Sequence, residues 1–292
     1  TLNSLYHTGK LKDLEERAKK LLSIFPSSIE INNILGIINL DLDQIDDAIE
    51  NFKKAVKVKP DFAEGYFNLG NCLRIKGEMH QALDAYKKAL SVRPDYAEVY
   101  LNKGNIFKKQ NQPDQALEAY KEALSINPGF ADAYNNKGNI YRDMGQPEKA
   151  IEAYKKALDI EPNNFEFHNN AGIALKDLGK TEDAFIAYRK ALSLNSDDPE
   201  SHVNLCYLLL SQGKIAEGLD EFEWRWLKRN ETLGKRSFSK PIWNGKESLK
   251  GKTILIWGEQ GPQDMIIWST CLKNLTALAE NCILECPAKL VP

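Results

Sequence analysis

The amino-acid sequence predicts an all-α protein, a solenoid of stacked helix pairs followed by a short partial α/β segment. Three observations support this fold class. Small and aromatic residues recur at a fixed interval of 34 residues over most of the chain. Glycines fall where the first helix of each pair would end. All five tryptophans lie after residue 223, which marks a change of composition near the C-terminus.

The interval of 34 residues is kept by five series of residues, which identifies a repeat architecture. The series are Pro60, Pro94, Pro128 and Pro162; Gly36, Gly70, Gly104, Gly138 and Gly172; Ala48, Ala82, Ala116, Ala150 and Ala184; Phe52, Tyr86, Tyr120, Tyr154, Tyr188 and Phe222; and Ala55, Ala89, Ala123, Ala157 and Ala191. A period this strict over five to six units predicts one supersecondary unit per period, stacked against its neighbours.

Each unit is predicted to be two helices joined by a tight turn. Small residues at positions 8 and 20 of the unit let the helices approach closely, and the aromatic residue at position 24 fills the space beside them. Position 15 suits a left-handed backbone conformation, which favours glycine or asparagine. The residues there are Gly77, Asn111, Gly145, Gly179 and Gly213. The prolines then stop or start a helix at each unit boundary.

The segment YFNLGNCLRIKGEMHQALDAYKKALSVRP and its equivalents resemble the tetratricopeptide repeat (TPR) family over about residues 1–228. The resemblance implies a right-handed superhelical solenoid whose first helices line the concave side. The predicted units are 1–28 (partial), 29–62, 63–96, 97–130, 131–164, 165–198 and 199–230 (degenerate), followed by a linker at 231–251 and a final segment at 252–292.

Composition and charge narrow the possible functions of the 292 residues. The formal net charge of −2 gives no overall basic excess for nucleic acid. No run reaches the roughly 18 apolar residues that a membrane span requires. Five scattered cysteines favour a reducing compartment, so we expect a cytoplasmic location. Thr1 suggests a trimmed chain. We expect no cofactor, no metal, and no nucleic-acid or membrane partner.

Asparagine recurs on one face of the first helices, although it is a poor helix former. At position 6 the residues are Asn68, Asn102, Asn136, Asn170 and Asn204; at position 9 they include Asn71, Asn105 and Asn139; and at position 5 they include Asn135 and Asn169. An amide carries donors and acceptors, as a peptide backbone does, so this face suits an extended polypeptide. The row resembles the asparagines of the O-linked N-acetylglucosamine transferase superhelix, which contact substrate backbone. The alternative is that these asparagines only tie neighbouring units together.

Position 12 carries a basic row, Arg74, Lys108, Arg142 and Lys176, while position 2 carries an acidic row of Glu30, Glu64, Glu98, Asp132, Glu166 and Glu200. The functional interpretation is a strip that attracts the carboxylates of an acidic peptide. The alternative is that both rows complement the helix dipoles. At position 5, Phe67 and Leu101 suggest either an apolar pocket for a partner's side chain or a self-association contact. His168 and His202, at position 4, are expected to pack against the second helix.

The C-terminal segment departs from the repeat. Thr253–Trp257 reads as a buried strand, about Met265–Glu280 as an amphipathic helix, and Cys282–Cys286 as a second strand. That order is one βαβ step of a parallel, Rossmann-like sheet.

The segments EWRW, PIWNG, GKTILIWGEQG and LEC resemble bacterial proteins that join TPR units to a glycosyltransferase-like module related to O-linked N-acetylglucosamine transferases and heptosyltransferases. The resemblance implies the start of a Rossmann lobe at 252–292. The family's usual GEQG-x-GD loop is altered, because Gln263 replaces its second glycine. One βαβ step cannot make the lobe of a nucleotide-sugar enzyme, so we expect this chain alone to be catalytically silent, with no catalytic residues of its own.

Two functions from different classes follow from the sequence. The leading prediction is a protein–protein interaction scaffold that binds an extended polypeptide in the concave groove, either an acidic polypeptide or one of any charge, with homo-oligomerisation as an alternative. The alternative is the substrate-recruiting N-terminal part of a protein glycosyltransferase whose catalytic domain lies beyond residue 292.

Overall fold

The computed structural model describes residues 11–227, 248–257 and 277–285. The first helices of the units are α3 (Ile29–Asp41), α5 (Ala63–Lys76), α7 (Ala97–Lys109), α9 (Ala131–Asp143), α11 (Phe165–Asp177) and α13 (Pro199–Ser211). The second helices are α4 (Ile45–Val58), α6 (Met79–Val92), α8 (Pro113–Ile126), α10 (Pro147–Ile160), α12 (Thr181–Leu194) and α14 (Ile215–Phe222). α2 (Leu11–Ile24) precedes them, and the short 3-10 helix η1 (Glu223–Leu227) follows.

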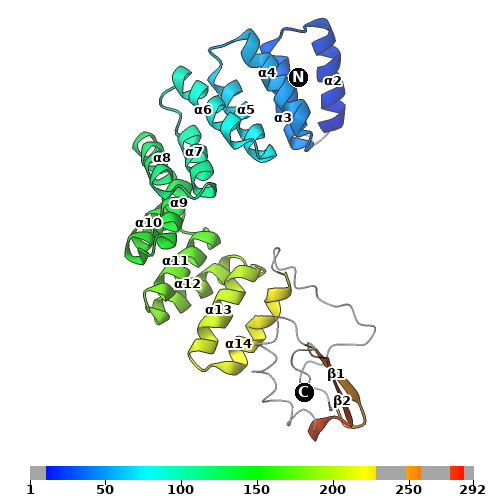
Figure 1. The fold of residues 1–292 in the computed structure, drawn as a ribbon, viewed down its shortest axis with the longest axis vertical. Coiled ribbons are helices and arrows are strands. Elements are labelled where there is room, and N and C mark those ends of the chain that lie inside the picture. The colour runs from blue at the N-terminus through cyan, green and yellow to red at the C-terminus, as the bar shows by residue number, and fades with distance from the viewer. Residues whose placement is uncertain (1–10, 228–247, 258–276, 286–292) are drawn as a thin grey trace.

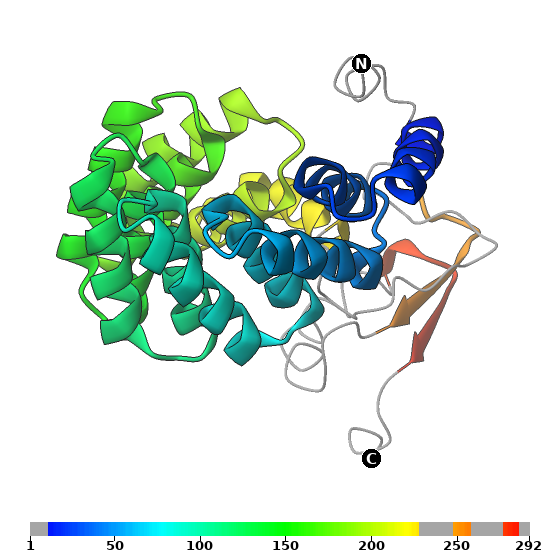
Figure 2. The ribbon, with the colours of Figure 1, turned by 90° about the horizontal axis from the view of Figure 1, so that it is seen from above.

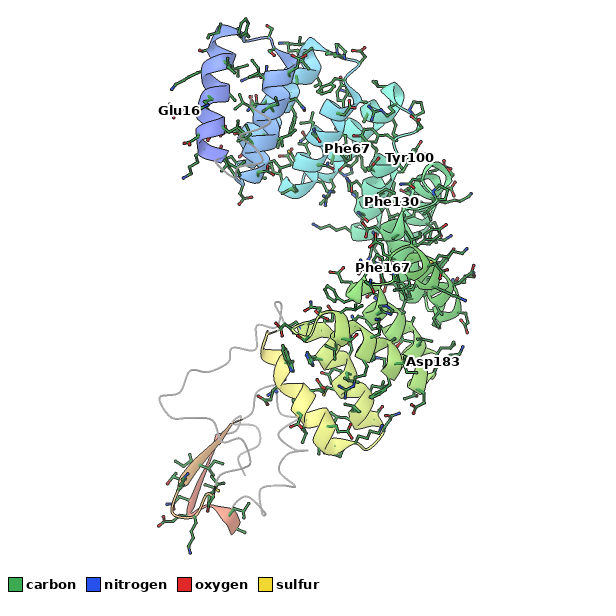
Figure 3. The ribbon with its side chains drawn as sticks, turned by 180° about the vertical axis from the view of Figure 1, so that it is seen from behind. Glu16, Phe67, Tyr100, Phe130, Phe167 and Asp183 are labelled. Carbon is green, nitrogen blue, oxygen red and sulfur yellow. The ribbon has the colours of Figure 1, made fainter. Side chains whose placement is uncertain are left out.

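The helices form a curved stack of antiparallel pairs, which confirms the predicted helical solenoid (Figure 1). In Figure 1, α5, α7 and α9 lie on the inner side of the curve, and α6, α8 and α10 lie on the outer side. Asp183 of α12 lies on the outer side (Figure 3). Seen from above in Figure 2, the stack turns as it advances, so it is superhelical. The inner surface is therefore built from first helices.

The small residue at position 8 and the aromatic residue at position 24 hold each pair together. Tyr120 is fully buried, and a Cβ atom added to Gly104 would lie 2.4 Å from its Cε1 atom. The same contact recurs in the other units, between Gly36 and Phe52, Gly70 and Tyr86, Gly138 and Tyr154, and Gly172 and Tyr188. In these pairs a glycine lets the backbone of the first helix come this close to the aromatic ring of the second helix. This contact explains why the position-8 and position-24 series keep the same interval.

The turn inside each unit has the predicted left-handed residue. Gly77 has φ 90° and Asn111 has φ 57°. The first full unit uses Asp43 at the same position, with φ 60°. The sequence pattern did not indicate Asp43, although aspartate, like asparagine, tolerates this conformation better than most residues.

Within one unit, the 3.6-residue period predicts that positions 4, 7, 8 and 11 of a first helix face its second helix, and this prediction accounts for only part of the burial. In α7, Gly104 at position 8 is buried as expected, but Val99 and Ile106 at positions 3 and 10 are buried as well, whereas Lys103 at position 7 is only half-buried. The reason is that each first helix packs against two second helices, its own and that of the preceding unit. Val99 and Ile106 share a core cluster with Tyr86 of the preceding α6. Each first helix therefore buries two stripes instead of one.

Two short strands complete the described residues. β1 (Thr253–Trp257) pairs in parallel with β2 (Asn281–Glu285), with Thr253 opposite Asn281. The second strand begins one residue earlier than the sequence suggested. Most of the helix predicted between them falls at residues 258–276, outside the described part. Two strands alone are a small parallel pair, so the predicted Rossmann-like βαβ unit is not supported. Among the described helices, none is both long and apolar enough to cross a membrane.

Candidate functional site

The position-6 asparagines join consecutive first helices to one another. Each donates a hydrogen bond from Nδ2 to an asparagine Oδ1 of the preceding unit. The bonds run from Asn68 to Asn33 (3.4 Å), Asn102 to Asn71 (2.8 Å), Asn136 to Asn105 (3.1 Å), Asn170 to Asn135 (3.0 Å) and Asn204 to Asn169 (3.0 Å). The tie between units, one of the two sequence interpretations, is therefore present at every junction from α3 to α13.

The acceptor of this bond depends on the residue at position 5. Where position 5 is asparagine, as at Asn135, the next unit bonds to that residue. Where it is apolar, as at Phe67 and Leu101, the bond goes to position 9 of the same helix, Asn71 or Asn105. Positions 5 and 9 are one helical turn apart, so they lie on the same face of the preceding first helix. The position-6 side chain of the next unit can therefore donate to an amide oxygen at either position.

The position-9 asparagines also accept from the buried tyrosines. The tyrosine Oη to asparagine Oδ1 distances are 2.7 Å for Tyr86 and Asn71, 2.9 Å for Tyr120 and Asn105, and 2.7 Å for Tyr154 and Asn139. Burial raises the pKa of Tyr86 to about 12, and the nearby Arg74 opposes part of that shift. Burial also raises the pKa values of Tyr120 and Tyr154. These hydroxyls are thus donors at any ordinary pH.

Each asparagine of the two rows has one amide atom engaged and the other available. Position-6 residues such as Asn102 use Nδ2, and within the described residues no hydrogen bond uses their Oδ1 atom. Position-9 residues such as Asn105 use Oδ1 and leave Nδ2 without an acceptor there. These free atoms are not among the buried unpaired atoms, so solvent reaches them. The first helices therefore have a row of free acceptors beside a row of free donors.

Asn135 and Asn169, predicted on the same face, have a different environment. They are only 8% and 5% exposed, and both oxygens are acceptors of inter-unit bonds. We therefore assign them to the junctions between units and not to the accessible surface. The free donor row itself ends after α9, because position 9 holds Ile173 in α11 and Tyr207 in α13.

Two members of the basic row form ion pairs, and the other two do not. Arg142 pairs with Asp143 at 3.3 Å, and Lys176 lies 3.9 Å from Asp177. In the described part of the chain, neither Arg74 nor Lys108 has a carboxylate within ion-pair distance. Burial lowers the pKa of the Lys108 amine, an effect that Asp143 opposes and Arg142 reinforces. The two cations nearest the N-terminus are therefore the ones open to an added carboxylate.

The acidic row at position 2 has partners of its own. Glu64 at the start of α5 pairs with Arg93 after α6, and Arg93 lies over the ring of Tyr96 at 4.5 Å. Hydrogen bonding to Arg93 lowers the pKa of Glu64. At Asp132, burial raises the pKa of the carboxyl, and the nearby Glu161 adds to the shift. The acids thus differ from one another in their surroundings, which a common dipole explanation does not account for.

Phe67 is a packing residue of the unit junction. Its ring centroid lies 4.9 Å from that of Tyr96 and 6.2 Å from that of Tyr86. Leu101 packs against the cluster of Ala116, Tyr120 and Ile140. Both side chains are half-buried between units, so they offer less to a partner than the apolar pocket suggested by the sequence.

Sequence reasoning missed the tyrosine–asparagine bonds, although a signal was present. Positions 24 and 9 vary together, because Tyr86, Tyr120 and Tyr154 are each matched by an asparagine. Tyr188, opposite Ile173, is the exception, and its buried hydroxyl has no hydrogen-bond partner among the residues that the structure describes. A comparison of the two series would have indicated the contact.

Comparison with solved structures finds tetratricopeptide repeat proteins. A crystal structure of MamA has 31% sequence identity and a TM-score of 0.52, over 56% of this chain and 95% of that chain. YrrB, described as a TPR protein with an unusual peptide-binding site, has 19% identity and a TM-score of 0.51, over 64% and 96%. The APC/C hetero-tetramer Cut9–Hcn1 has 20% identity and a TM-score of 0.65, over 80% and 46%. The last two likenesses concern the fold alone.

A search of curated proteins finds no match to this chain. Family models described as tetratricopeptide repeat match residues 97–130, 131–164 and 153–185, and a model described as TPR repeat matches 36–73 and 70–111. The matches run without a gap from residue 36 to residue 185, just over half of the 292 residues. They agree with the helix pairs and the junctions described above. The chain therefore belongs to the tetratricopeptide repeat family, whose fold is a scaffold for protein–protein interaction.

Proposed function

We propose that the protein binds an extended polypeptide along the inner side of the solenoid, mainly through the partner's backbone. The observation that carries this proposal is that each asparagine side chain uses only one of its two polar amide atoms in hydrogen bonds within the fold. One amide atom of each builds the junctions, and the other faces solvent as a free acceptor or donor. The tying and the binding interpretations of the sequence are therefore compatible, because an asparagine side chain has more bonding capacity than the fold uses.

An extended chain has the complementary groups. Its backbone N–H groups would donate to the Oδ1 atoms of Asn102 and Asn136, and its carbonyls would accept from the Nδ2 atoms of Asn105 and Asn139. Such contacts depend little on the partner's side chains, so they favour a shared backbone conformation over a particular sequence. A helical ligand has its backbone groups bonded internally and would gain little from these rows.

The binding footprint we propose covers α5, α7 and α9. Among the helices that the structure describes, these three alone have a free acceptor at position 6 and a free donor at position 9, the donors being Asn71, Asn105 and Asn139. Asn170 and Asn204 continue the acceptor row beyond them without a donor beside it. The central units would therefore hold the partner most tightly.

We also propose that the bound segment is acidic where it crosses Arg74 and Lys108. These two cations have no ion-pair partner among the described residues, whereas Arg142 and Lys176 do. A partner's carboxylate would form charge-assisted hydrogen bonds there and would offset the desolvation that Lys108 already experiences. YrrB, a TPR protein with an unusual peptide-binding site, is a precedent for peptide binding by this fold.

Replacement of Asn139 with aspartate tests the donor row. Aspartate keeps the oxygen that accepts from Tyr154 but removes the free NH2 group, and Asn139 is not used in an inter-unit bond. We expect the Kd of an uncharged peptide, selected from a display library and measured by calorimetry, to rise about tenfold, the loss of roughly one hydrogen bond. The matched control is Gln115→Glu on the outer helix α8, which changes the charge equally. If both variants bind like the natural chain, the peptide does not use this row.

Replacement of Lys108 with methionine tests the acidic preference. We expect the affinity for a Glu-rich peptide to fall and its salt dependence to weaken, because one partly buried cation is lost. Lys121→Met on α8 removes a charge outside the proposed groove and should leave both quantities as they are. The acidic preference is wrong if the natural chain binds Glu-rich and Gln-rich versions of the peptide equally at low salt.

The glycosyltransferase role remains a second proposal with less support. It relies on the resemblance of the C-terminal segments, of which the structure describes one parallel strand pair. On this proposal the inner side would present acceptor proteins to a catalytic domain beyond residue 292. Transfer of a labelled sugar by a gene product that includes such a domain, reduced by Asn139→Asp, would support it, and no transfer to any bound polypeptide would contradict it.

A further inference from the structure

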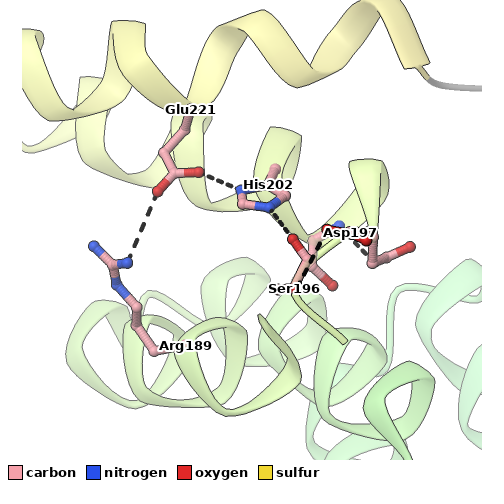
Figure 4. Close-up of polar contacts among 7 residues, drawn as sticks. Arg189, Ser196, Asp197, His202 and Glu221 are labelled. Carbon is pink, nitrogen blue, oxygen red and sulfur yellow. Dashed lines mark hydrogen bonds and ion pairs between the residues drawn. The ribbon is translucent and has the colours of Figure 1, made fainter. Parts of the chain in front are cut away.

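His202 on α13 has polar contacts with Glu221 and Ser196 (Figure 4), and its ring contacts Trp224. Its Nδ1 atom pairs with Glu221 Oε2 on α14, and its Nε2 atom lies 2.8 Å from the carbonyl oxygen of Ser196 in the turn before α13. Its ring is stacked on Trp224 of η1, with 3.9 Å between the ring centroids and 7° between the planes. One side chain therefore contacts both elements that follow α13.

The two polar partners of the His202 ring are both acceptors, a carboxylate and a carbonyl oxygen. A neutral imidazole has one N–H and can donate to one of them, whereas an imidazolium donates to both. The side chains of His202 and Glu221 are only 12% and 15% exposed, so water is a poor substitute for a lost donor. A cation stacked on an indole face is also favourable. The complete set of contacts therefore requires the doubly protonated ring.

His168 is an internal comparison, because it occupies the same position in the preceding unit. Its Nε2 atom lies 2.9 Å from the carbonyl oxygen of Pro162, which is six residues earlier, as Ser196 is for His202. In the part of the chain that the structure describes, no carboxylate pairs with the His168 ring. One N–H satisfies this ring, so its neutral form suffices. The carboxylate of Glu221 is what distinguishes His202.

Other charged groups near His202 come from each neighbouring element. Arg189 of α12 lies 3.8 Å from Glu221 Oε1. In the turn before α13, Asp197 accepts from the Ser196 hydroxyl at 3.2 Å. In η1, Arg225 bonds to the carbonyl of Phe222 at 2.9 Å and to the carboxylate of Glu223 at 3.3 Å.

We infer that His202 is a proton-dependent latch that fastens α14 and η1 to the end of the solenoid. α14 depends on such a latch because no further repeat covers it among the described residues. Leu219 on α14 is 37% exposed, whereas Ile49, its equivalent on α4, is 4% exposed. When the ring loses a proton it keeps only one of its two hydrogen bonds, and α14 opens more often. This inference does not depend on the proposed function.

Amide hydrogen exchange of the full chain between about pH 5.5 and about pH 8, which bracket the usual titration of imidazole, tests the latch. After correction for intrinsic exchange, we expect the protection of α14 amides to fall on the order of tenfold as pH rises, about 1.4 kcal/mol. Amides of α10, remote from this contact, should not change. The ring nitrogens of His202 should both carry protons at the acidic end of the range, which nitrogen chemical shifts measure directly.

Two variants separate the latch from a general pH effect. Glu221→Gln removes the carboxylate and should abolish the pH dependence of α14, whereas His168→Gln should leave it in full. The inference is overturned if Glu221→Gln keeps the pH dependence, or if the natural chain shows none. It is also overturned if the His202 ring has a single N–H at the acidic end, a measurement that needs no variant to fold.

Discussion

Replacement of Gly104 with valine is expected to destabilise the protein by about 3 kcal/mol. A Cβ atom at this position would lie 2.4 Å from Tyr120 Cε1 and 2.7 Å from its Cδ1. The ring cannot move away easily, because it is fully buried and its hydroxyl bonds to Asn105. The gain in helix propensity from replacing glycine is smaller than this clash. Urea denaturation followed by circular dichroism measures the loss.

Gly129→Ala in the turn after α8 is the matched control. A Cβ atom there would meet only the side-chain oxygen of Asn127, at 3.4 Å. We expect a change of no more than about 0.5 kcal/mol. If Gly104→Val and Gly129→Ala unfold at the same urea concentration, the close approach of helix and ring is not what sets the interval of glycine and aromatic residues.

Replacement of Asn105 with leucine is expected to cost about 2 to 4 kcal/mol. The Oδ1 atom of Asn105 accepts from both Tyr120 Oη and Asn136 Nδ2. Leucine leaves a buried hydroxyl and an amide without their acceptor, and an unpaired buried donor costs more than a hydrogen bond contributes when it is made. Thermal or chemical denaturation checks the loss, and circular dichroism verifies the helix content.

Tyr120→Phe in the Asn105→Leu background should restore part of the stability, because it removes the stranded hydroxyl. Tyr188→Phe is the control, because among the described residues the Tyr188 hydroxyl already lacks a hydrogen-bond partner opposite Ile173. We expect Tyr188→Phe to be neutral or stabilising, while Tyr120→Phe in the natural chain costs about 1 kcal/mol. Equal effects of the two phenylalanines would contradict the role assigned to Asn105.

Most of the fold was predictable because the repeat places one kind of contact at every unit. The glycine at position 8 and the tyrosine at position 24 specify a close helix pair wherever they recur, and Asn111 follows the same turn rule as Gly77. The burial of Val99 and Ile106 was not predictable from one helix considered alone, because it comes from contact with the preceding unit. The division into units at the stated boundaries remains a prediction.

The candidate site was predictable in its residue types but not in its bonding. The sequence placed Asn102, Asn105 and Asn136 on one face, yet it could not show which amide atom each uses. That choice depends on position 5, where Phe67 and Asn135 send the inter-unit bond to different acceptors. The pairing of Arg142 with Asp143, which leaves Lys108 as the more available cation, likewise depends on side-chain placement.

The two acceptor registers have a mechanical consequence. At the joints α5–α7 and α7–α9, a single amide oxygen holds both a tyrosine of its own unit and an asparagine of the next. At α9–α11 the two donors bond to separate residues, the tyrosine to Asn139 and the next unit's asparagine to Asn135. A pulling force applied along the superhelix should therefore break the inter-unit bond at α9–α11 while the tyrosine–asparagine bond of that unit stays intact. At the two earlier joints, displacement of the shared asparagine would disturb both bonds at once.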